Sequence, residues 1–327
     1  MGDPLLVLDS VGVRLATPRG PLRAVDDVSL TLEAGRTLGI VGESGSGKTM
    51  LSRAILRLLP HNATTTGSVR LEGRELTGLA PEALRRLRGR SIAVVLQDPM
   101  TSLNPVLTIG TQIVETLQAH LELDAAAARA RALDLLGAVG LPAPEQRLRQ
   151  YPHQLSGGMR QRVAIAIALS CEPRLLIADE PTTALDVTVQ AQILDLLARE
   201  QQRRRMAMLL ITHDLGIVAG RTDDVAVMYA GKVVERASTR ALFKAMRMPY
   251  TEALLAAIPR VDAEPHTPLA AIPGRPPDMT RLPSGCAFAP RCPRTAERCT
   301  RERPSLGGAP GHAFACWRPL EAPPARP

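Results

Sequence analysis

The stretch at residues 42–49 restricts the fold of this chain more than any other, because it reads GESGSGKT. It matches the phosphate-binding loop pattern G-x-x-x-x-G-K-S/T. It also follows an apolar run at residues 38–41 and opens into a helix-like segment at residues 50–59. This motif requires that order of strand, loop and helix. We therefore expect an α/β fold that binds a nucleoside triphosphate through this loop.

The residue types of the loop suit phosphate binding. Glycines let the backbone curl so that successive N–H groups point at phosphate oxygens, and the following helix adds its dipole. Lys48 is expected to bridge the β- and γ-phosphates, and the Thr49 hydroxyl to hold Mg²⁺. Only three of the 40 basic residues are lysines, which argues against an accidental match at a glycine-rich turn. The expected contacts to the nucleotide are Gly42, Ser44, Gly45, Ser46, Gly47, Lys48 and Thr49.

Length and composition indicate a globular protein. A chain of 327 residues with 45% apolar content is long enough for one large domain, alone or with a small appendage. No apolar stretch approaches the ~18 residues of a membrane span, and the N-terminus has no secretion signal. We therefore expect a cytosolic protein, or one attached to a membrane only through partners. The net charge of +8 fits a nucleic-acid or anionic membrane partner, and equally an arginine-rich solvated surface.

The pattern of apolar residues and turns predicts alternating strands and helices. It favours a mainly parallel core sheet, an antiparallel patch near the N-terminus and an all-helical insert. In the helical stretch at residues 109–139, Asp124 is the expected N-cap of an alanine-rich helix. A further helix is expected at residues 187–204. The expected strands lie at residues 5–13, 24–32, 69–71, 91–96, 175–178 and 208–212, with a hairpin at 225–229 and 232–235.

Composition changes after residue 258. The last 69 residues contain 15 of the 28 prolines and four of the five cysteines. We expect a separate, loop-rich module there that adds no strand to the sheet. The predicted domains are a nucleotide-binding domain at residues 1–258, with a helical subdomain at about 98–170, and a Pro/Cys-rich module at 259–327.

Two acidic residues end the apolar strand expected at residues 175–178. A P-loop enzyme needs carboxylates beside its loop, and Asp179 and Glu180 supply two. Asp179 can hold Mg²⁺ directly or through water, and Glu180 can polarise the attacking water.

The segment at residues 155–161, LSGGMRQ, predicts a second anion-binding helix start. Ser156 can cap a helix whose free N–H groups face an anion. This start lies more than 100 residues from the phosphate loop and is redundant for that loop's own nucleotide. It makes sense if it meets the γ-phosphate bound by a second subunit.

Together these features resemble the ATP-binding cassette (ABC) ATPases. The resemblance covers roughly residues 5–240. It rests on the phosphate loop, Gln97 after a strand, the LSGGMRQ segment, the acids at 179–180, the ALD triplet at 184–186 and His213 after a strand. It implies an ABC ATPase core with an inserted helical subdomain and a small Cys-rich C-terminal module.

The resemblance also implies roles for single residues. Gln97 would sense Mg²⁺ and the attacking water and signal to a transmembrane partner. Ser156 and Gly158 would grip the γ-phosphate across a dimer interface, and Asp186 would tie the two subunits together. His213 would contact the γ-phosphate, the alternative being a hydrogen-bonded core histidine.

The adenine contact departs from this family's usual aromatic stack. The matching position is Leu15, and the first Phe, Tyr or Trp of the chain is Tyr151. Adenine is expected to rest on Leu15 and Val25, or on the guanidinium plane of Arg14 or Arg23. Loss of a stack worth about 0.5–1.5 kcal/mol would weaken binding by roughly tenfold or less.

Further segments narrow the resemblance to the dipeptide/oligopeptide importer ATPases. They are residues 97–105 (QDPMTSLNP), 151–154 (YPHQ), 249–255 (PYTEALL), 272–274 (IPG) and the Cys-rich tail. This resemblance covers nearly the whole chain. It implies a paralogous ATPase or a second copy as partner, two permease subunits and an extracytoplasmic binding protein, at the cytoplasmic face of the membrane.

The sequence leaves open other transported cargoes and other classes of ABC protein. Close relatives carry nickel, opines or oligosaccharides. A DNA-maintenance ABC ATPase would insert heptad coiled coils or a zinc module before the LSGGMRQ segment. Residues 50–154 contain neither such heptads nor a cysteine. A translation-type ABC protein normally has two cassettes in one chain, and this sequence has one.

Four tail cysteines suggest a metal site in a segment with little apolar content: Cys286, Cys292, Cys299 and Cys316. Structural zinc sites usually begin with a tight C-x₂₋₄-C pair, which this tail lacks, and a reducing cytosol disfavours disulfides. Four cysteines also suit a 4Fe–4S cluster, and the resembling importer ATPases carry one there. Zinc and unligated thiols remain open.

Two neighbouring residues are set apart from this site. His312 could replace a thiolate, but a structural or supporting role is the simpler assignment. Cys171 is expected to be a buried apolar residue. The tail site lies outside every nucleotide motif, so we expect it to be structural or redox-sensing.

Overall fold

The computed structural model describes residues 4–98, 102–183, 185–258, 271–309 and 311–321. Contacts between Cα atoms divide the chain into two compact units. The first unit comprises Met1–Leu5, Glu33–Arg36 and Gly78–Leu209. The second unit comprises Leu6–Leu32, Thr37–Thr77 and Leu210–Pro327. Each unit is described by itself below.

The second unit contains the antiparallel patch predicted near the N-terminus. Four strands follow one another in the order β2-β1-β4-β5. Their bounds are β1 (Pro4–Thr17), β2 (Gly20–Glu33), β4 (Ala63–Leu71) and β5 (Arg74–Glu75). β1 and β4 pair in antiparallel register from Leu6↔Leu71 to Leu15↔Ala63. The strands extend beyond the predicted ranges because backbone pairing continues through their polar ends.

The second unit also holds the strands around the phosphate loop, in the order β11-β12-β10-β9-β3. Their bounds are β3 (Thr37–Val41), β9 (Asp224–Tyr229), β10 (Lys232–Ser238), β11 (Gly307–Ala309) and β12 (His312–Phe314). β3 and β9 are parallel, whereas β9 and β10 form the predicted antiparallel hairpin. Ala230 and Gly231 turn this hairpin with φ of 49° and 78°. Two positive φ angles match the twist of the flanking strands.

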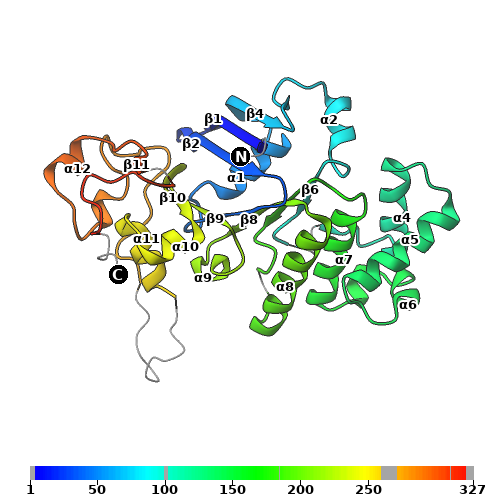
Figure 1. Cartoon of the computed structure of the whole chain (residues 1–327). Helices are drawn as coiled ribbons and strands as arrows, with labels where there is room; N and C mark the ends of the chain where they lie inside the picture. Colours follow the sequence, from blue (N-terminus) through cyan, green and yellow to red (C-terminus); the bar gives the residue numbers. More distant parts are fainter. Residues whose placement is uncertain (1–3, 99–101, 184, 259–270, 310, 322–327) are drawn as a thin grey trace. The chain divides into compact units, whose positions relative to one another are not determined.

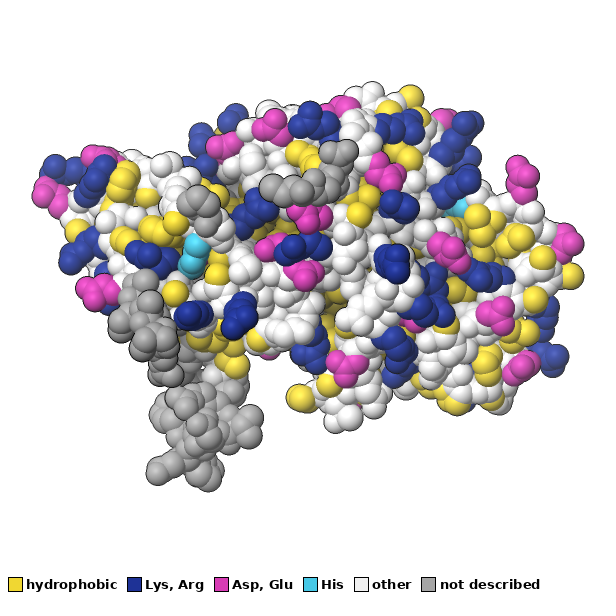
Figure 2. Space-filling model, viewed as in Figure 1, with side chains coloured by type: hydrophobic (Ala, Val, Ile, Leu, Met, Phe, Trp, Pro, Cys, Tyr) yellow, Lys and Arg dark blue, Asp and Glu magenta, His cyan; other side chains and the backbone are white. Residues whose placement is uncertain are grey.

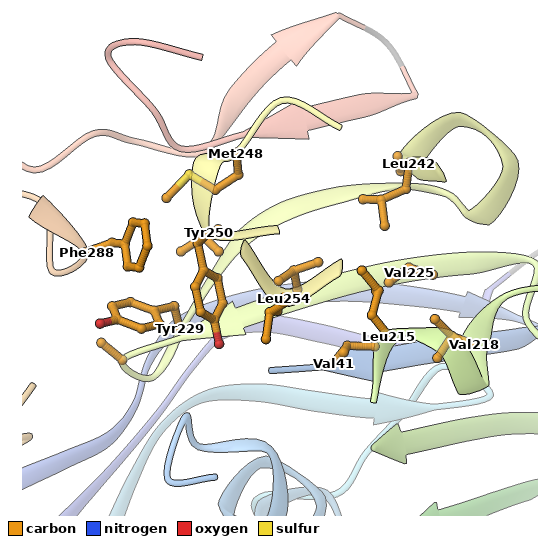
Figure 3. Packing of buried hydrophobic residues seen from close by; sticks show 14 residues of the cluster. Val41, Leu215, Val218, Val225, Tyr229, Leu242, Met248, Tyr250, Leu254 and Phe288 are labelled. Carbon is orange, nitrogen blue, oxygen red and sulfur yellow. The ribbon is translucent and has the colours of Figure 1, made fainter. Parts of the chain in front are cut away.

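The helices of the second unit lie between and after these strands. They are α1 (Lys48–Leu56), α9 (Leu215–Val218), α10 (Thr239–Lys244), α11 (Pro249–Ala256) and α12 (Glu297–Arg301), with a short 3₁₀ turn at Ala289–Arg291. Phe288 in the tail packs its ring against those of Tyr229 and Tyr250, at centroid distances of 5.4 and 5.3 Å (Figure 3). The tail therefore contributes to the apolar core of this unit.

The first unit combines buried parallel strands with a helical group. β6 (Ile92–Val95) pairs in parallel with β7 (Leu175–Asp179), and β8 (Ala207–Thr212) starts in this unit and ends in the second. Every residue of β7 and β8 is buried, as expected for strands covered on both faces. This burial explains their uninterrupted apolar sequences.

The helices of this unit include those predicted at residues 109–139 and 187–204. They are α2 (Pro81–Leu87), α4 (Ile109–His120), α5 (Ala125–Ala138), α6 (Pro144–Leu148), α7 (Gly157–Leu169) and α8 (Val187–Arg204), with a 3₁₀ turn at Pro152–Gln154. Figure 1 shows α4 to α7 gathered in one group. The Asp124 carboxylate caps α5 by accepting a hydrogen bond from the Ala127 N–H at 2.7 Å, as predicted. α8 has the predicted bounds.

One prediction about the tail is wrong, because β11 and β12 do extend the sheet. β12 pairs with β10 from Glu235↔Phe314 to Ala237↔His312. The Glu235 side chain is fully buried and accepts hydrogen bonds from the backbone N–H groups of Arg247 (2.6 Å) and Met248 (3.1 Å). It also lies 2.7 Å from Nε2 of His312. A carboxylate that needs several donors thus draws the tail to this edge, which composition could not reveal.

The predicted domain boundary after residue 258 stays a prediction. Residues 259–270 lie outside the described residues, and the described tail belongs to the second unit by its contacts. Among the described residues, no helix combines the length and the apolar character that crossing a membrane requires.

We predict that Glu235→Ala destabilises the second unit by about 3 kcal/mol, since it leaves buried donors without an acceptor. Urea unfolding followed by the fluorescence of Trp317, the single tryptophan, measures this change in the tail. Glu297→Ala removes a carboxylate whose side chain is 74% exposed and serves as the control. An unchanged midpoint for Glu235→Ala would contradict the role of this carboxylate.

Candidate nucleotide site

The phosphate loop connects β3 to α1 in the second unit. α1 begins at Lys48, after Gly47 with φ of 105°. The Lys48 side chain is buried, and its Nζ donates to the carbonyl oxygens of Gly42 (2.7 Å) and Glu43 (2.9 Å). Among the other loop residues, Ser46 is buried, Thr49 is half-buried and Ser44 and Gly45 are exposed. The ammonium group is therefore held inside the curl of the loop.

Two glycines of the loop lie too close to neighbouring backbone for any side chain. A Cβ on Gly42 would lie 2.2 Å from the carbonyl oxygen of Met228 in β9. A Cβ on Gly47 would lie 2.2 Å from that of Ala24 in β2. Gly47 also needs the left-handed φ that glycine adopts readily. The motif's glycines thus have a packing reason in addition to the approach of a phosphate.

The residues expected to contact adenine differ in solvent exposure. Val25 in β2 is 1% exposed, so its side chain belongs to the core. Leu15 in β1 is half-buried, and Arg14 and Arg23 are exposed. Leu15 or an arginine is therefore better placed than Val25 to meet a base. His213 follows β8 in the same unit and is exposed.

In the first unit, the parallel register of β6 and β7 brings Gln97 and Glu180 together. Val95 pairs with Ala178, so residues two positions further along each strand lie at the same level. Nε2 of Gln97 donates to Oε2 of Glu180 at 3.1 Å, and the Thr183 hydroxyl donates to the same oxygen at 2.9 Å. Oε2 of Glu180 is thereby oriented by two donors.

The backbone at this point is strained. Glu180 has φ of 48°, in the left-handed region that costs non-glycine residues free energy. Asp179, just before it, is 2% exposed at the end of β7. Strain of this kind gathers at functional sites, where the surrounding structure maintains it.

The two polar residues predicted to meet a second subunit are both N-caps. Ser156 accepts from the Met159 N–H at 3.3 Å at the start of α7, and Asp186 accepts from the Val189 N–H at 2.9 Å at the start of α8. A Cβ on Gly158 would lie 2.7 Å from Cγ1 of Val189, so glycine allows these helix starts to approach. Both caps are exposed. Ala184 of the ALD triplet lies outside the described residues.

Sequence reasoning missed an ion pair between the tail and the phosphate loop. Nη1 and Nη2 of Arg291 donate to Oε2 and Oε1 of Glu43 at 2.7 and 2.9 Å. The backbone N–H of Glu43 donates to the Tyr250 hydroxyl at 2.8 Å. In the sequence, Tyr250 and the IPG segment at 272–274 served only as evidence for the family resemblance. Glu43 lies 248 residues from Arg291, so no local sequence pattern indicates that they pair.

The four tail cysteines lie in one neighbourhood without forming a recognisable metal site. The Cys286 N–H donates to the Cys299 carbonyl at 2.8 Å. Burial, with smaller contributions from the other three thiols, raises the pKa of Cys316 to about 11, and burial likewise raises those of Cys286 and Cys292. Within the described part of the chain, no three His, Cys, Asp or Glu side chains are arranged to hold a metal ion. The geometry therefore does not support the expected 4Fe–4S cluster.

The two residues set apart from the cysteine site behave as expected. His312 is engaged with Glu235, which gives it a structural partner. Cys171, two residues after the end of α7, is buried, and burial raises the pKa of its thiol.

The loop, the paired acids and the capped helix starts define an ABC-type ATPase. The ABC transporter family model matches residues 25–183, and the model for the oligopeptide/dipeptide transporter C-terminal region matches residues 234–299. With its full-length relatives, this places the chain in the family of oligopeptide and dipeptide transport ATP-binding proteins.

Two curated relatives are similar over nearly their whole length. The oligopeptide transport ATP-binding protein OppD of Salmonella typhimurium is 48% identical, over 97% of this chain and 94% of the relative. The dipeptide transport ATP-binding protein DppD of Escherichia coli is 47% identical, over 97% of each. Among solved structures, the dimeric ABC transporter cassette MJ0796 is 29% identical with a TM-score of 0.65, and the likeness covers 72% of this chain and 99% of the cassette.

Proposed function

We propose that this chain is the ATP-hydrolysing subunit of an ABC importer for dipeptides or oligopeptides. The observation that carries the proposal is the near full-length likeness to peptide transport ATP-binding proteins, at 48% and 47% identity. The likeness includes the C-terminal region, which the match at residues 234–299 assigns to oligopeptide and dipeptide transporters. Peptide is therefore favoured over nickel, opine or oligosaccharide cargo.

In this proposal the phosphate loop binds MgATP. Backbone N–H groups of the loop and the Lys48 ammonium would meet the phosphates, while Thr49, Gln97 and Asp179 would hold Mg²⁺. Oxygen donors at a buried strand end suit this hard cation, and Asp179 is 2% exposed. When bound there, the cation would neutralise charge on the β- and γ-phosphates.

Glu180 is the proposed general base. Its Oε2 accepts hydrogen bonds from Gln97 and Thr183, and these donors orient the carboxylate that would take a proton from the attacking water. Gln97 would report the state of this carboxylate to the helical insert that follows it, and His213 would contact the γ-phosphate. Leu96 and Tyr151 are each 39% exposed and Val106 is 75% exposed, which gives this part of the chain apolar surface for a permease subunit.

A complete site needs a second ATPase subunit. Ser156 and Gly158 would meet the γ-phosphate bound by the partner, and Asp186 would contact the partner across the interface. Val187, beside Asp186, is 83% exposed, as an interface residue would be in an isolated chain. The partner is a paralogous ATPase or a second copy. Two permease subunits and an extracytoplasmic binding protein would complete the importer at the cytoplasmic face of the membrane.

A nucleic-acid function is the weaker alternative. On the face shown in Figure 2, basic and acidic side chains are interspersed. This pattern favours a solvated surface over a binding track for phosphates, which gathers basic side chains along one face.

We predict that Glu180→Gln keeps ATP binding and lowers turnover by at least about 100-fold, because the amide cannot accept the proton of the attacking water. Dimers should accumulate with ATP and be visible by size-exclusion chromatography. The matched control is Glu172→Gln, an exposed carboxylate in the same unit. Wild-type turnover by a complex in which the partner's base is also replaced would refute this role for Glu180.

Cargo is tested with the assembled importer in lipid vesicles. We expect the binding protein loaded with a di- to pentapeptide to raise ATP hydrolysis several-fold over the empty binding protein, since ligand stabilises the state that closes the ATPase dimer. Nickel, an opine and an oligosaccharide are the comparison ligands. Stimulation by one of these and not by peptides would reassign the cargo.

We also propose that Cys286, Cys292, Cys299 and Cys316 hold a 4Fe–4S cluster. Support comes from the resemblance of the tail to these importer ATPases and from the closeness of the four thiols, since the other three add to the rise in the pKa of Cys316 that burial causes. The iron ions of a cluster would offset the electrostatic repulsion between neighbouring thiolates. The local rearrangement needed to ligate a cluster is part of the proposal, because the present side-chain arrangement does not form a metal site.

Protein purified without oxygen should contain about four irons and four sulfides per chain and absorb visible light. Cys292→Ser should lose most of the iron, whereas the control Cys171→Ser should keep it. Colourless protein with one tightly bound zinc, or with no metal, would end the cluster proposal and leave the ATPase proposal intact.

A further inference from the structure

The guanidinium of Arg291 has an acceptor for each of its five N–H donors. Two are the carboxylate oxygens of Glu43. The others are the Pro273 carbonyl at 2.8 Å, the Tyr229 hydroxyl at 3.3 Å and the Ile272 carbonyl at 3.4 Å. The Arg291 side chain is 4% exposed. A planar guanidinium with every donor satisfied has little freedom to move.

The tail holds Arg291 firmly from its own side. The Arg291 N–H donates to the Phe288 carbonyl at 2.9 Å, in a tight turn between Cys286 and Cys292. Phe288 is 1% exposed and packs against Tyr229 and Tyr250. The position of the guanidinium is therefore set by the fold of the cysteine-bearing segment.

Glu43 is the second residue of the phosphate loop, and three of its groups are engaged. Its carboxylate binds Arg291, its N–H donates to the Tyr250 hydroxyl, and its carbonyl accepts from the Lys48 ammonium at 2.9 Å. The same carbonyl accepts from the Ser46 N–H at 3.1 Å. Movement of Glu43 would therefore disturb both the curl of the loop and the lysine.

We propose that Arg291 is a positioning residue for the phosphate loop. By holding the Glu43 carboxylate, it keeps the loop in the conformation that binds phosphate, and it makes nucleotide affinity depend on the folded tail. This inference rests on the proposed function, in which the loop binds ATP. Arg291 itself does not need to touch the nucleotide.

A purely structural tether would have a different signature. It would lower the stability of the tail and leave the ATP affinity of the folded protein unchanged. A positioning contact weakens ATP binding while the tail remains folded. It also makes the effects of Arg291 and Glu43 interdependent, because both changes break one contact.

The experiment compares Arg291→Gln, Glu43→Gln and the double variant in the full chain. Affinity is measured with a fluorescent ATP analogue, and Trp317 emission reports the fold of the tail. We expect each single variant to raise the Kd for the ATP analogue at least about tenfold, because each loses a buried bidentate ion pair. The Kd of the double variant should be no higher than that of the weaker-binding single variant. In the assembled importer, KM for ATP should rise while kcat at saturating ATP stays within about threefold of wild type.

The matched control is Arg301→Ala, which removes a tail arginine whose side chain is 73% exposed, and its Kd should equal that of wild type. If wild type does not bind ATP, the proposed function fails. If wild type binds and the folded single variants bind equally well, or if the two fold-changes multiply, the positioning role is overturned. If Arg291→Gln changes Trp317 emission, the tail is altered in that variant. The Kd of Glu43→Gln then tests the positioning role alone, because this variant keeps Arg291.

Discussion

The path of the phosphate loop depends on backbone contacts that exclude any side chain. Gly42 lies against the Met228 carbonyl in β9 and Gly47 against the Ala24 carbonyl in β2, each with 2.2 Å to a hypothetical Cβ. Such a clash with backbone cannot be relieved by rotating a side chain, so the two strands set the position of the loop. Lys48 then closes the curl from inside by donating to two loop carbonyls. The loop, the lysine and the start of α1 consequently behave as one element, and whatever fixes this element influences phosphate binding.

Contacts between charged groups help to set where the described tail lies in the second unit. Glu235 accepts from two backbone N–H groups and lies against His312, while Arg291 pairs with Glu43. A buried charge without partners costs free energy, and replacing one partner of a pair leaves the other buried and uncompensated. These contacts therefore act strongly against alternative arrangements of the tail even where their net contribution to stability is modest. Phe288 adds an apolar contact with Tyr229 and Tyr250 and completes the attachment.

In the first unit, strand pairing and helix capping determine where the functional polar residues lie. Parallel pairing of β6 with β7 places Gln97 beside Glu180, and the strained backbone at Glu180 is maintained by the buried strand before it. Ser156 and Asp186 each have a purely local reason to be present, because each caps a helix. A role toward a partner subunit would come in addition to capping, and their exposure is compatible with both.

The sequence by itself determined the features whose causes are local: the phosphate loop, the Ala230-Gly231 hairpin, the Asp124 cap, the bounds of α8 and the acids at the end of β7. Each depends on a turn preference, a capping side chain or an apolar run within a few residues. Only the tertiary structure decided that β12 pairs with β10, that Val25 faces the core and that Arg291 meets Glu43. Proline and cysteine content suggested a separate tail, but a buried carboxylate at Glu235 draws that tail onto the sheet. In a chain rich in arginine, nothing around Arg291 distinguishes it from the others, because its partner is chosen by packing across 248 residues of sequence.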